Sequence, residues 1–173
     1  FMFESNPLQS NRSRNWFNLD WLLYNFKLEK SFNKQSSLLF SFFGLNASRN
    51  TIGFRSNRVD QVDPMNERDL ITGDFKNFGL EVKFLKNYSL FKNKSVMVFG
   101  GKYYRSKTSS NQGPGSDKVN ADFKFYLSSF PNYPNQSNYT YPNKNLALFG
   151  ENIFYFNDNI SITPGFRIEN IET

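Results

Sequence analysis

The chain of 173 residues contains no cysteine and no histidine. Without cysteine it forms no disulfide and offers no thiolate nucleophile or thiolate metal ligand. Without histidine it also lacks Ser-His and Cys-His catalysis and the ordinary histidine sites for zinc. The sequence therefore predicts no enzyme activity, no catalytic residue, no metal site and no cofactor.

Long hydrophobic runs are absent as well. The apolar segment from Ser37 to Leu45 is among the longest in the chain. It falls well short of the roughly 18 residues that a membrane-spanning helix needs. If this chain crosses a membrane, it must do so as strands.

What the chain does contain is basic and aromatic. Its formal net charge is +6, and 21 Phe and 9 Tyr residues supply much of its apolar content. Soluble cores are normally dominated by Leu, Val and Ile, so this balance favours aromatic side chains at an interface, as in the girdles of outer-membrane barrels. A compositional bias from an AT-rich genome is the alternative explanation.

Apolar and polar residues alternate after the tight turn at 157–159. One parity holds Ile160, Ile162, Pro164, Phe166 and Ile168, and the other holds Ser161, Thr163, Gly165, Arg167 and Glu169. The same alternation sets Phe78, Leu80, Val82 and Phe84 against Asn77, Gly79, Glu81 and Lys83. A strand projects successive side chains to opposite faces, so the pattern predicts strands that separate an apolar side from a charged side. Near the N-terminus the parity is clean only from Leu22 onward.

Six strands are predicted along the chain. They cover residues 16–32, 37–50, 75–86, 95–105, 144–156 and 160–171, with long connections at 51–74 and 106–143. Short and long connections alternate, as in outer-membrane barrels with short periplasmic turns and long extracellular loops. A soluble β-sandwich also alternates, but its strands are usually about 5 or 6 residues long, whereas these approach the roughly 9 to 11 residues that cross a bilayer. The predicted fold class is all-β, an antiparallel transmembrane β-barrel segment.

Several motifs carry a resemblance to a known family. Residues 141–154 contain the run Ala147-Leu148-Phe149-Gly150-Glu151, and residues 161–169 contain Thr163-Pro164-Gly165-Phe166-Arg167-Ile168-Glu169. Together they resemble the "ALF.E" and "TPG.R.E" strands of TonB-dependent outer-membrane receptors. Residues 68–70 with 73–81, residues 111–116 and residues 130–137 resemble the ferric-dicitrate-receptor branch of Bacteroidetes type. The resemblance covers nearly the whole chain and is most specific from Arg68 to Glu169.

The resemblance implies an outer-membrane barrel of roughly 22 strands that is closed by a plug. Residues 1–173 would form about six strands of that barrel, and we expect the plug and the TonB-contacting segment to lie outside them. The implied location is the outer membrane of a Gram-negative bacterium. The implied partners are a ferric chelate as cargo, membrane lipid and lipopolysaccharide, and the TonB complex through the plug. No nucleic acid partner is expected, because long two-sided strands with trimmed turns do not resemble a single-strand binding groove.

Cargo would meet the outer loops. Ferric citrate and similar siderophore complexes are anionic, and arginine supplies several fixed donors that match carboxylate oxygens. The candidate ligand-binding residues are Arg49, Arg55, Arg58, Arg68, Lys102 and Arg105. The candidate lumen-facing residues are Glu81, Lys83, Arg167 and Glu169, for which an ion-pair ladder between neighbouring strands is the purely structural alternative. Solvated loop charge, or contact with lipopolysaccharide phosphates, is the alternative for the basic residues.

The sequence predicts import of an iron chelate, most specifically ferric citrate or a similar anionic siderophore. Two alternatives remain open. The same architecture could import a glycan or a peptide, and a soluble β-rich adhesin or carbohydrate-binding module belongs to a different class. Detergent extraction and heat-modifiable gel mobility would separate the module from the receptor.

Overall fold

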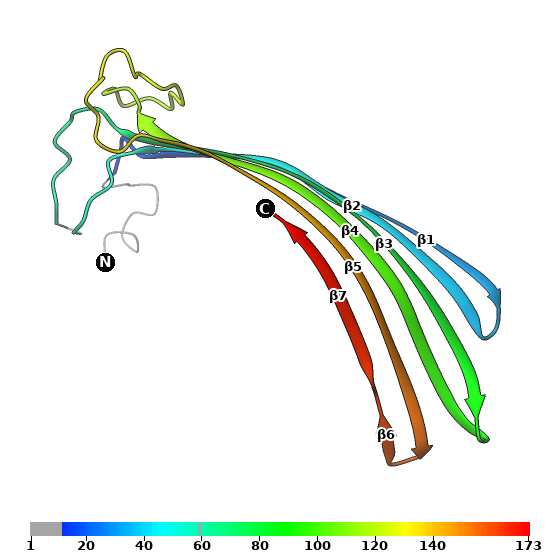
Figure 1. Cartoon of the computed structure of the whole chain (residues 1–173). Helices are drawn as coiled ribbons and strands as arrows, with labels where there is room; N and C mark the ends of the chain where they lie inside the picture. The colour runs from blue at the N-terminus through cyan, green and yellow to red at the C-terminus, as the bar shows by residue number, and fades with distance from the viewer. Residues whose placement is uncertain (1–11, 59) are drawn as a thin grey trace. The chain divides into compact units, whose positions relative to one another are not determined.

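The computed structural model describes residues 12–58 and 60–173 as a single antiparallel sheet (Figure 1). The strands are β1 (Trp16–Asn33), β2 (Ser36–Gly53), β3 (Asp69–Leu90), β4 (Asn93–Pro114), β5 (Ser137–Asn157), β6 (Ile160–Ile162) and β7 (Gly165–Glu172). Their order in the sheet follows the chain from β1 to β6, and β7 also pairs with β5. The all-β prediction is confirmed. Within the described residues no helix is long and apolar enough to span a membrane.

The strands extend further than the sequence predicts. The predicted connections at 51–74 and 106–143 are wrong in extent, because β2 continues to Gly53, β3 begins at Asp69 and β4 runs to Pro114. The connections that remain are residues 54–68 and 115–136. Ladder hydrogen bonds join backbone groups and need no apolar side chain, so polar stretches such as 106–112 continue a strand without an alternating pattern.

The predicted strand at 160–171 is also wrong in one respect, because it divides at Thr163 and Pro164 into β6 and β7. Proline has no backbone N–H and cannot donate to a ladder. The register between β5 and β6 also shifts between Tyr155 and Asn157. Pairing resumes at once, since the Asn152 N–H donates to the Pro164 carbonyl at 3.0 Å. β5 and β7 then stay in register from Glu151↔Gly165 to Lys144↔Glu172.

Three connections are turns of only two residues. In the turns at 34–35 and 158–159, the Oδ1 atoms of Asn33 and Asn157 accept hydrogen bonds from backbone N–H groups two residues on, at 2.8 and 2.9 Å. This is the Asx turn that asparagine favours. The third turn consists of Phe91 and Lys92, with φ of 49° and 70°. Positive φ at both positions matches a type I′ hairpin turn, which usually uses Asn and Gly. The sequence therefore gives no turn signal there, and the predicted strand ends at Lys86 and Ser95 are wrong.

The chain divides into two compact units, and β1 to β5 each contribute residues to both. Unit 1 contains the chain up to Trp21, Ala47–Asp74 and Thr108–Thr140, and therefore the two long connections. Its small core places Ile52 and Leu70, both fully buried, against Gly115. A Cβ atom at Gly115 would lie 2.5 Å from the Ile52 Cδ1 atom, so a larger residue there would require the Ile52 side chain to move.

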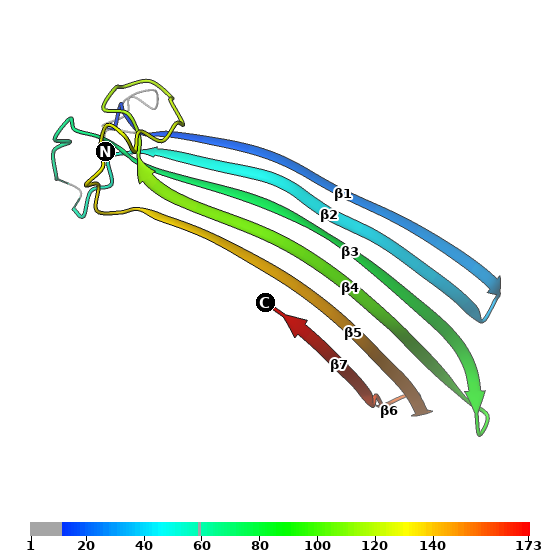
Figure 2. The ribbon, with the colours of Figure 1, turned by 45° about the horizontal axis from the view of Figure 1, so that its top comes forward.

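Unit 2 contains Leu22–Asn46, Phe75–Lys107 and Tyr141–Thr173, and its strands run side by side in both ribbon views (Figures 1 and 2). Ring contacts assign its two faces. The apolar face carries the pairs Tyr24–Phe42, Phe78–Tyr103 and Phe99–Phe166, with ring centroids 5.5, 6.0 and 6.4 Å apart. The charged face carries Arg167 over the ring of Phe149 and Lys102 over the ring of Phe43. Because successive side chains of a strand project to opposite faces, these contacts also assign the remaining side chains of each strand to one face or the other.

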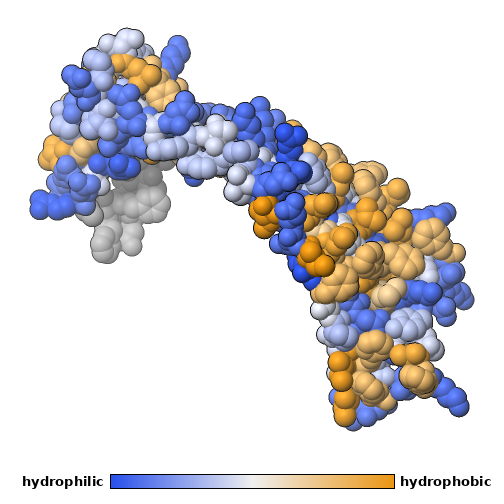
Figure 3. All heavy atoms as spheres, in the orientation of Figure 1, coloured by the Kyte–Doolittle hydropathy of each residue, from blue (hydrophilic) through white to orange (hydrophobic). Residues whose placement is uncertain are grey.

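The apolar face of unit 2 has no second layer over it among the described residues. Leu22, Phe26, Leu148, Ile162, Phe166 and Ile168 each leave at least half of their surface exposed, with Ile168 at 67%. Figure 3 shows these strands covered with apolar residues, drawn in orange. A β-sandwich would bury such side chains between two sheets. The described residues do not form one.

Candidate ligand-contacting loops and charged face

A buried arginine joins the two long connections of unit 1. Arg68 stands directly before β3 and is 0% exposed. Its guanidinium donates to the Ser116 carbonyl at 2.9 Å, to the Ser116 hydroxyl at 2.7 Å and to the Arg14 carbonyl at 2.9 Å. Its own carbonyl accepts from the Gly115 N–H at 2.7 Å. Arg68 therefore fastens the start of β3 to the end of β4 and to the residues before β1.

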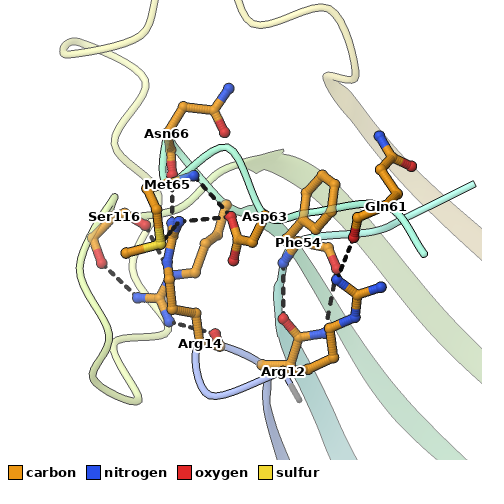
Figure 4. A network of polar contacts seen from close by, with 10 residues as sticks. Arg12, Arg14, Phe54, Gln61, Asp63, Met65, Asn66 and Ser116 are labelled. Atoms are coloured by element: carbon orange, nitrogen blue, oxygen red, sulfur yellow. Dashed lines mark hydrogen bonds and ion pairs between the residues drawn. The ribbon is translucent and has the colours of Figure 1, made fainter. Parts of the chain in front are cut away.

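Arg14 is the second buried arginine, at 1% exposure. It forms an ion pair with Asp63 at 2.9 Å, and it also donates to the Asn66 carbonyl and contacts the Met65 sulfur at 3.6 Å (Figure 4). Asp63 accepts a further hydrogen bond from the Met65 N–H at 2.9 Å, and Met65 lies in the left-handed region with φ of 61°. Burial, and then the neighbouring charge of Arg14, lower the pKa of Arg68. Asp63 is thus the direct counter-charge of Arg14, and the carboxylates of Asp122, Asp117 and Asp63 partly offset the lowering of the Arg68 pKa.

Burial removes Arg68 from the candidate ligand contacts. All three of its side-chain nitrogen atoms donate to groups of the fold, so none is directed to solvent. A cargo contact would require those hydrogen bonds to break. The sequence pattern placed Arg68 among loop cations because an arginine that supports a loop and one that faces solvent look alike in sequence.

Asp69 organises a second polar cluster in unit 1. Its carboxylate accepts from the Tyr133 hydroxyl at 2.9 Å and from the Gln112 amide at 2.9 and 3.0 Å. The Arg55 Nε atom lies 3.8 Å away, with the Arg55 side chain 63% exposed. Burial and the hydrogen bond to Asp69 raise the pKa of Tyr133 above its ordinary value. Asp69 therefore holds the C-terminal part of the 115–136 connection through Tyr133, while most of the Arg55 side chain stays in solvent.

The remaining candidate cations occupy different environments. Arg58 pairs with Asp60 at 3.4 Å, and both side chains are largely exposed. Arg49 is exposed within β2. Lys102 and Arg105 lie inside β4 and not in a loop, so the expectation that the candidate ligand contacts lie in the outer loops is wrong for these two residues. Three residues apart on a strand, they project to opposite faces, so the structure does not bring them together.

The four candidate lumen residues share the charged face of unit 2. Lys83 pairs with Glu81 at 2.6 Å, and Arg167 pairs with Glu169. Each pair joins residues two apart on one strand, so it is not the ladder between neighbouring strands that was the structural alternative. Arg167 also lies 5.6 Å from the centre of the Phe149 ring, a cation–π distance. The opposed residues Lys144 and Glu172 do pair across strands, at 3.2 Å, but they share the parity of Leu148 and Ile168 and therefore lie on the apolar face.

A hollow of about 540 Å³ opens in unit 1 at residues that the sequence did not name as candidate ligand contacts. Its lining consists of Asn111, Gln112, Phe125, Leu127, Gln136, Ser137 and Asn138. Amide and apolar side chains therefore form its wall, and no charged side chain takes part. The abundance of asparagine in the whole chain conceals such a cluster, because the residues come from β4, β5 and the connection between them.

Comparison with protein-family models finds none that matches this chain, and comparison with curated proteins finds no match either. Within residues 12–58 and 60–173, no group of three or more acidic side chains is placed to hold a metal ion. The sheet, its two faces and its loops are therefore the features from which function is inferred.

Proposed function

We propose that this chain is part of a TonB-dependent receptor in the outer membrane of a Gram-negative bacterium, and that the receptor imports an iron chelate, ferric citrate or a similar anionic siderophore. The observation that carries the proposal is the apolar face of unit 2, which stays exposed on a single-layered sheet. A sheet with one apolar and one charged face is stable where lipid covers the apolar face and the charged face lines an enclosed interior. Its open edges require further strands, because unpaired backbone is costly in hydrocarbon.

The dimensions of the apolar face support this assignment. On β3, Lys76 and Lys86 stand at either end of the apolar series Phe78, Leu80, Val82 and Phe84. The ten residue steps between the two lysines span roughly 34 Å along a strand. At the tilt of barrel strands, about 35–45°, this corresponds to roughly 24–28 Å across the bilayer, close to the apolar band of about 25 Å in outer-membrane barrels.

The connections support the orientation. Three two-residue turns belong to unit 2, and the two long connections belong to unit 1. Barrels of this class have short turns on the periplasmic side and long loops outside. Unit 1 would then meet cargo, and Arg55 and Arg58 offer largely exposed guanidinium groups to an anionic chelate. The charged face would line the lumen and face the plug.

Uptake measurements test this function. We expect that deletion of the full reading frame lowers uptake of radiolabelled ferric citrate by iron-starved cells, while uptake of an unrelated hydroxamate siderophore stays unchanged. The receptor should be extracted from the membrane fraction only by detergent and should show heat-modifiable mobility. Normal ferric-citrate uptake in the deletion strain would reject the cargo, and a protein recovered in the soluble fraction would reject the receptor.

Arg55→Ala should weaken cargo binding in the complemented strain. A hydrogen bond to a charged group contributes about 1.5–3 kcal/mol, so loss of this guanidinium should raise the half-saturating ferric-citrate concentration about tenfold or more. Lys34→Ala, in a turn of unit 2, is the control and should leave the concentration unchanged. Equal uptake curves for both variants and the parent would exclude Arg55 as a cargo contact.

One observation favours glycan import as the second candidate. The 540 Å³ hollow is lined by amides and by Phe125, without charge. Amides pair with sugar hydroxyl groups and an aromatic ring packs against a sugar face, so this chemistry suits a neutral glycan better than a ferric chelate. Growth of the deletion strain on single polysaccharides distinguishes the two cargoes, because glycan import predicts loss of growth on one polysaccharide with ferric-citrate uptake intact.

A further inference from the structure

The apolar face of unit 2 ends in a basic hollow of about 350 Å³. Tyr24, Asn46, Lys76, Phe78, Arg105 and Lys107 contribute side chains to its lining. The Phe78 ring contacts the ring of Tyr103, and the Tyr24 hydroxyl donates to the Asn77 carbonyl at 3.4 Å. Lys76 shares the parity of Phe78, and Arg105 and Lys107 share that of Tyr103, so the three cations lie on the apolar face and not on the charged face.

The residues of this face change character in a fixed order along two neighbouring strands. On β3 the order is Lys76, then Phe78, then Leu80 and Val82. On β4 it is Lys107 and Arg105, then Tyr103, then Phe99 and Met97. Each strand therefore passes from cation to aromatic ring to apolar side chain, which is the order of phosphate, interface and acyl chain in a lipid leaflet.

The three cations are not neutralised by the fold. Among the described residues none of Lys76, Arg105 and Lys107 forms an ion pair, and all three side chains are exposed. The acidic residue nearest along β3 is Asp74, whose carboxylate accepts from the Ser109 hydroxyl at 3.3 Å. Three positive charges around one hollow favour an anionic ligand.

We propose that this hollow binds the phosphorylated head group of an outer-leaflet glycolipid, with Arg105, Lys76 and Lys107 as phosphate ligands. Arginine and lysine donors match phosphate oxygens, and Tyr24 and Phe78 provide an amphipathic floor on which the sugar lies. The acyl chains then lie along Leu80, Val82 and Phe99. This inference rests on the proposed function, because it requires the apolar face to lie in the outer membrane with unit 1 outside.

The test uses the full-length receptor, purified in mild detergent, and diphosphorylated lipid A as the ligand. The triple variant Lys76→Gln, Arg105→Gln and Lys107→Gln should bind lipid A about a hundredfold more weakly than the parent, from the effect of three cations at an anionic surface. The affinity of this variant for lipid A should equal the affinity of the parent for dephosphorylated lipid A. The control triple Lys34→Gln, Lys92→Gln and Lys94→Gln removes the same charge at the turns of unit 2 and should leave binding unchanged.

Each result bears on a stated part of the inference. Equal lipid A binding by the parent and the first triple variant overturns it. Displacement of lipid A by equimolar inorganic phosphate shows that the site takes free phosphate, and equal binding of phosphatidylglycerol vesicles shows that it takes any anionic lipid; both overturn the glycolipid assignment. Heat-modifiable mobility of the same preparations tests the receptor proposal separately. If that mobility is present and the first triple variant binds lipid A as the parent does, only this inference is rejected.

Discussion

Arg68→Met is expected to open the two long connections while leaving the strands of unit 2 paired. The substitution removes all three side-chain donors and leaves the Ser116 hydroxyl and the Arg14 carbonyl without their partner. The Ser116 carbonyl keeps only the Arg68 backbone N–H, at 3.4 Å. Each buried unsatisfied group costs about 1–3 kcal/mol. Removal of the repulsion between the two buried arginines offsets part of that cost, so we expect a net loss of at least about 2 kcal/mol in local stability.

Limited proteolysis of intact cells measures this loss. Cleavage within residues 54–68 and 115–136 follows the population of the open form, and about 2 kcal/mol raises that population roughly thirtyfold. Arg58→Met is the matched control, because it removes an arginine from the same connection at an exposed pair and should change cleavage little. If Arg68 instead contacts cargo, Arg68→Met will lower ferric-citrate binding without any increase in cleavage.

Phe26→Arg is expected to prevent insertion of the sheet, and its neighbour Asn25→Arg is not. Phe26 shares the parity of Tyr24, which contacts Phe42 on the apolar face, whereas Asn25 has the opposite parity. An arginine facing lipid costs about 2–4 kcal/mol at the middle of the bilayer and less near its surfaces. The two positions lie at nearly the same depth, so depth does not explain a difference between them.

The yield of folded receptor in the outer membrane measures this effect, by heat-modifiable mobility of each variant expressed at the same level. We expect a strong decrease for Phe26→Arg and a yield near that of the parent for Asn25→Arg. Phe26 is already 56% exposed in the sheet, so a water-soluble protein would tolerate arginine there. Equal yields for the two variants would therefore contradict the assignment of the apolar face to lipid.

The sequence identified the strands best where side chains on the two faces differ most. Alternation placed the cores of β3 and β7. It put Glu81 on the same face as Lys83, and Arg167 on the same face as Glu169. It did not place strand ends, because backbone pairing continues through polar residues such as Ser106–Gln112. It placed a connection between residues 86 and 95 but made it too long, because the two-residue turn consists of Phe91 and Lys92, which rarely adopt positive φ.

The candidate site was less accessible to sequence reasoning. Counting loop cations grouped Arg68 with Arg55, although one is buried and the other largely exposed, because burial depends on partners such as Ser116 that lie far away in sequence. It grouped Lys102 with Arg105, although strand parity separates them. The basic hollow, by contrast, groups residues that the sequence kept apart. Lys76 and Arg105 come together only when β3 and β4 are adjacent, which the pairing of strands reveals and composition does not.

Lipid contact at alternate residues of β3 is the most direct test of the account. This chain contains no native cysteine, so Leu80→Cys, Glu81→Cys, Val82→Cys and Lys83→Cys can each be labelled with a nitroxide in the membrane-embedded receptor. The account predicts that collisions with oxygen, which concentrates in hydrocarbon, are high at positions 80 and 82 and low at 81 and 83. At positions 80 and 82, collisions with a water-soluble nickel complex should be low, the reverse of the result with oxygen. Equal access of the nickel complex to all four positions would contradict the claim that one face of this sheet lies against lipid.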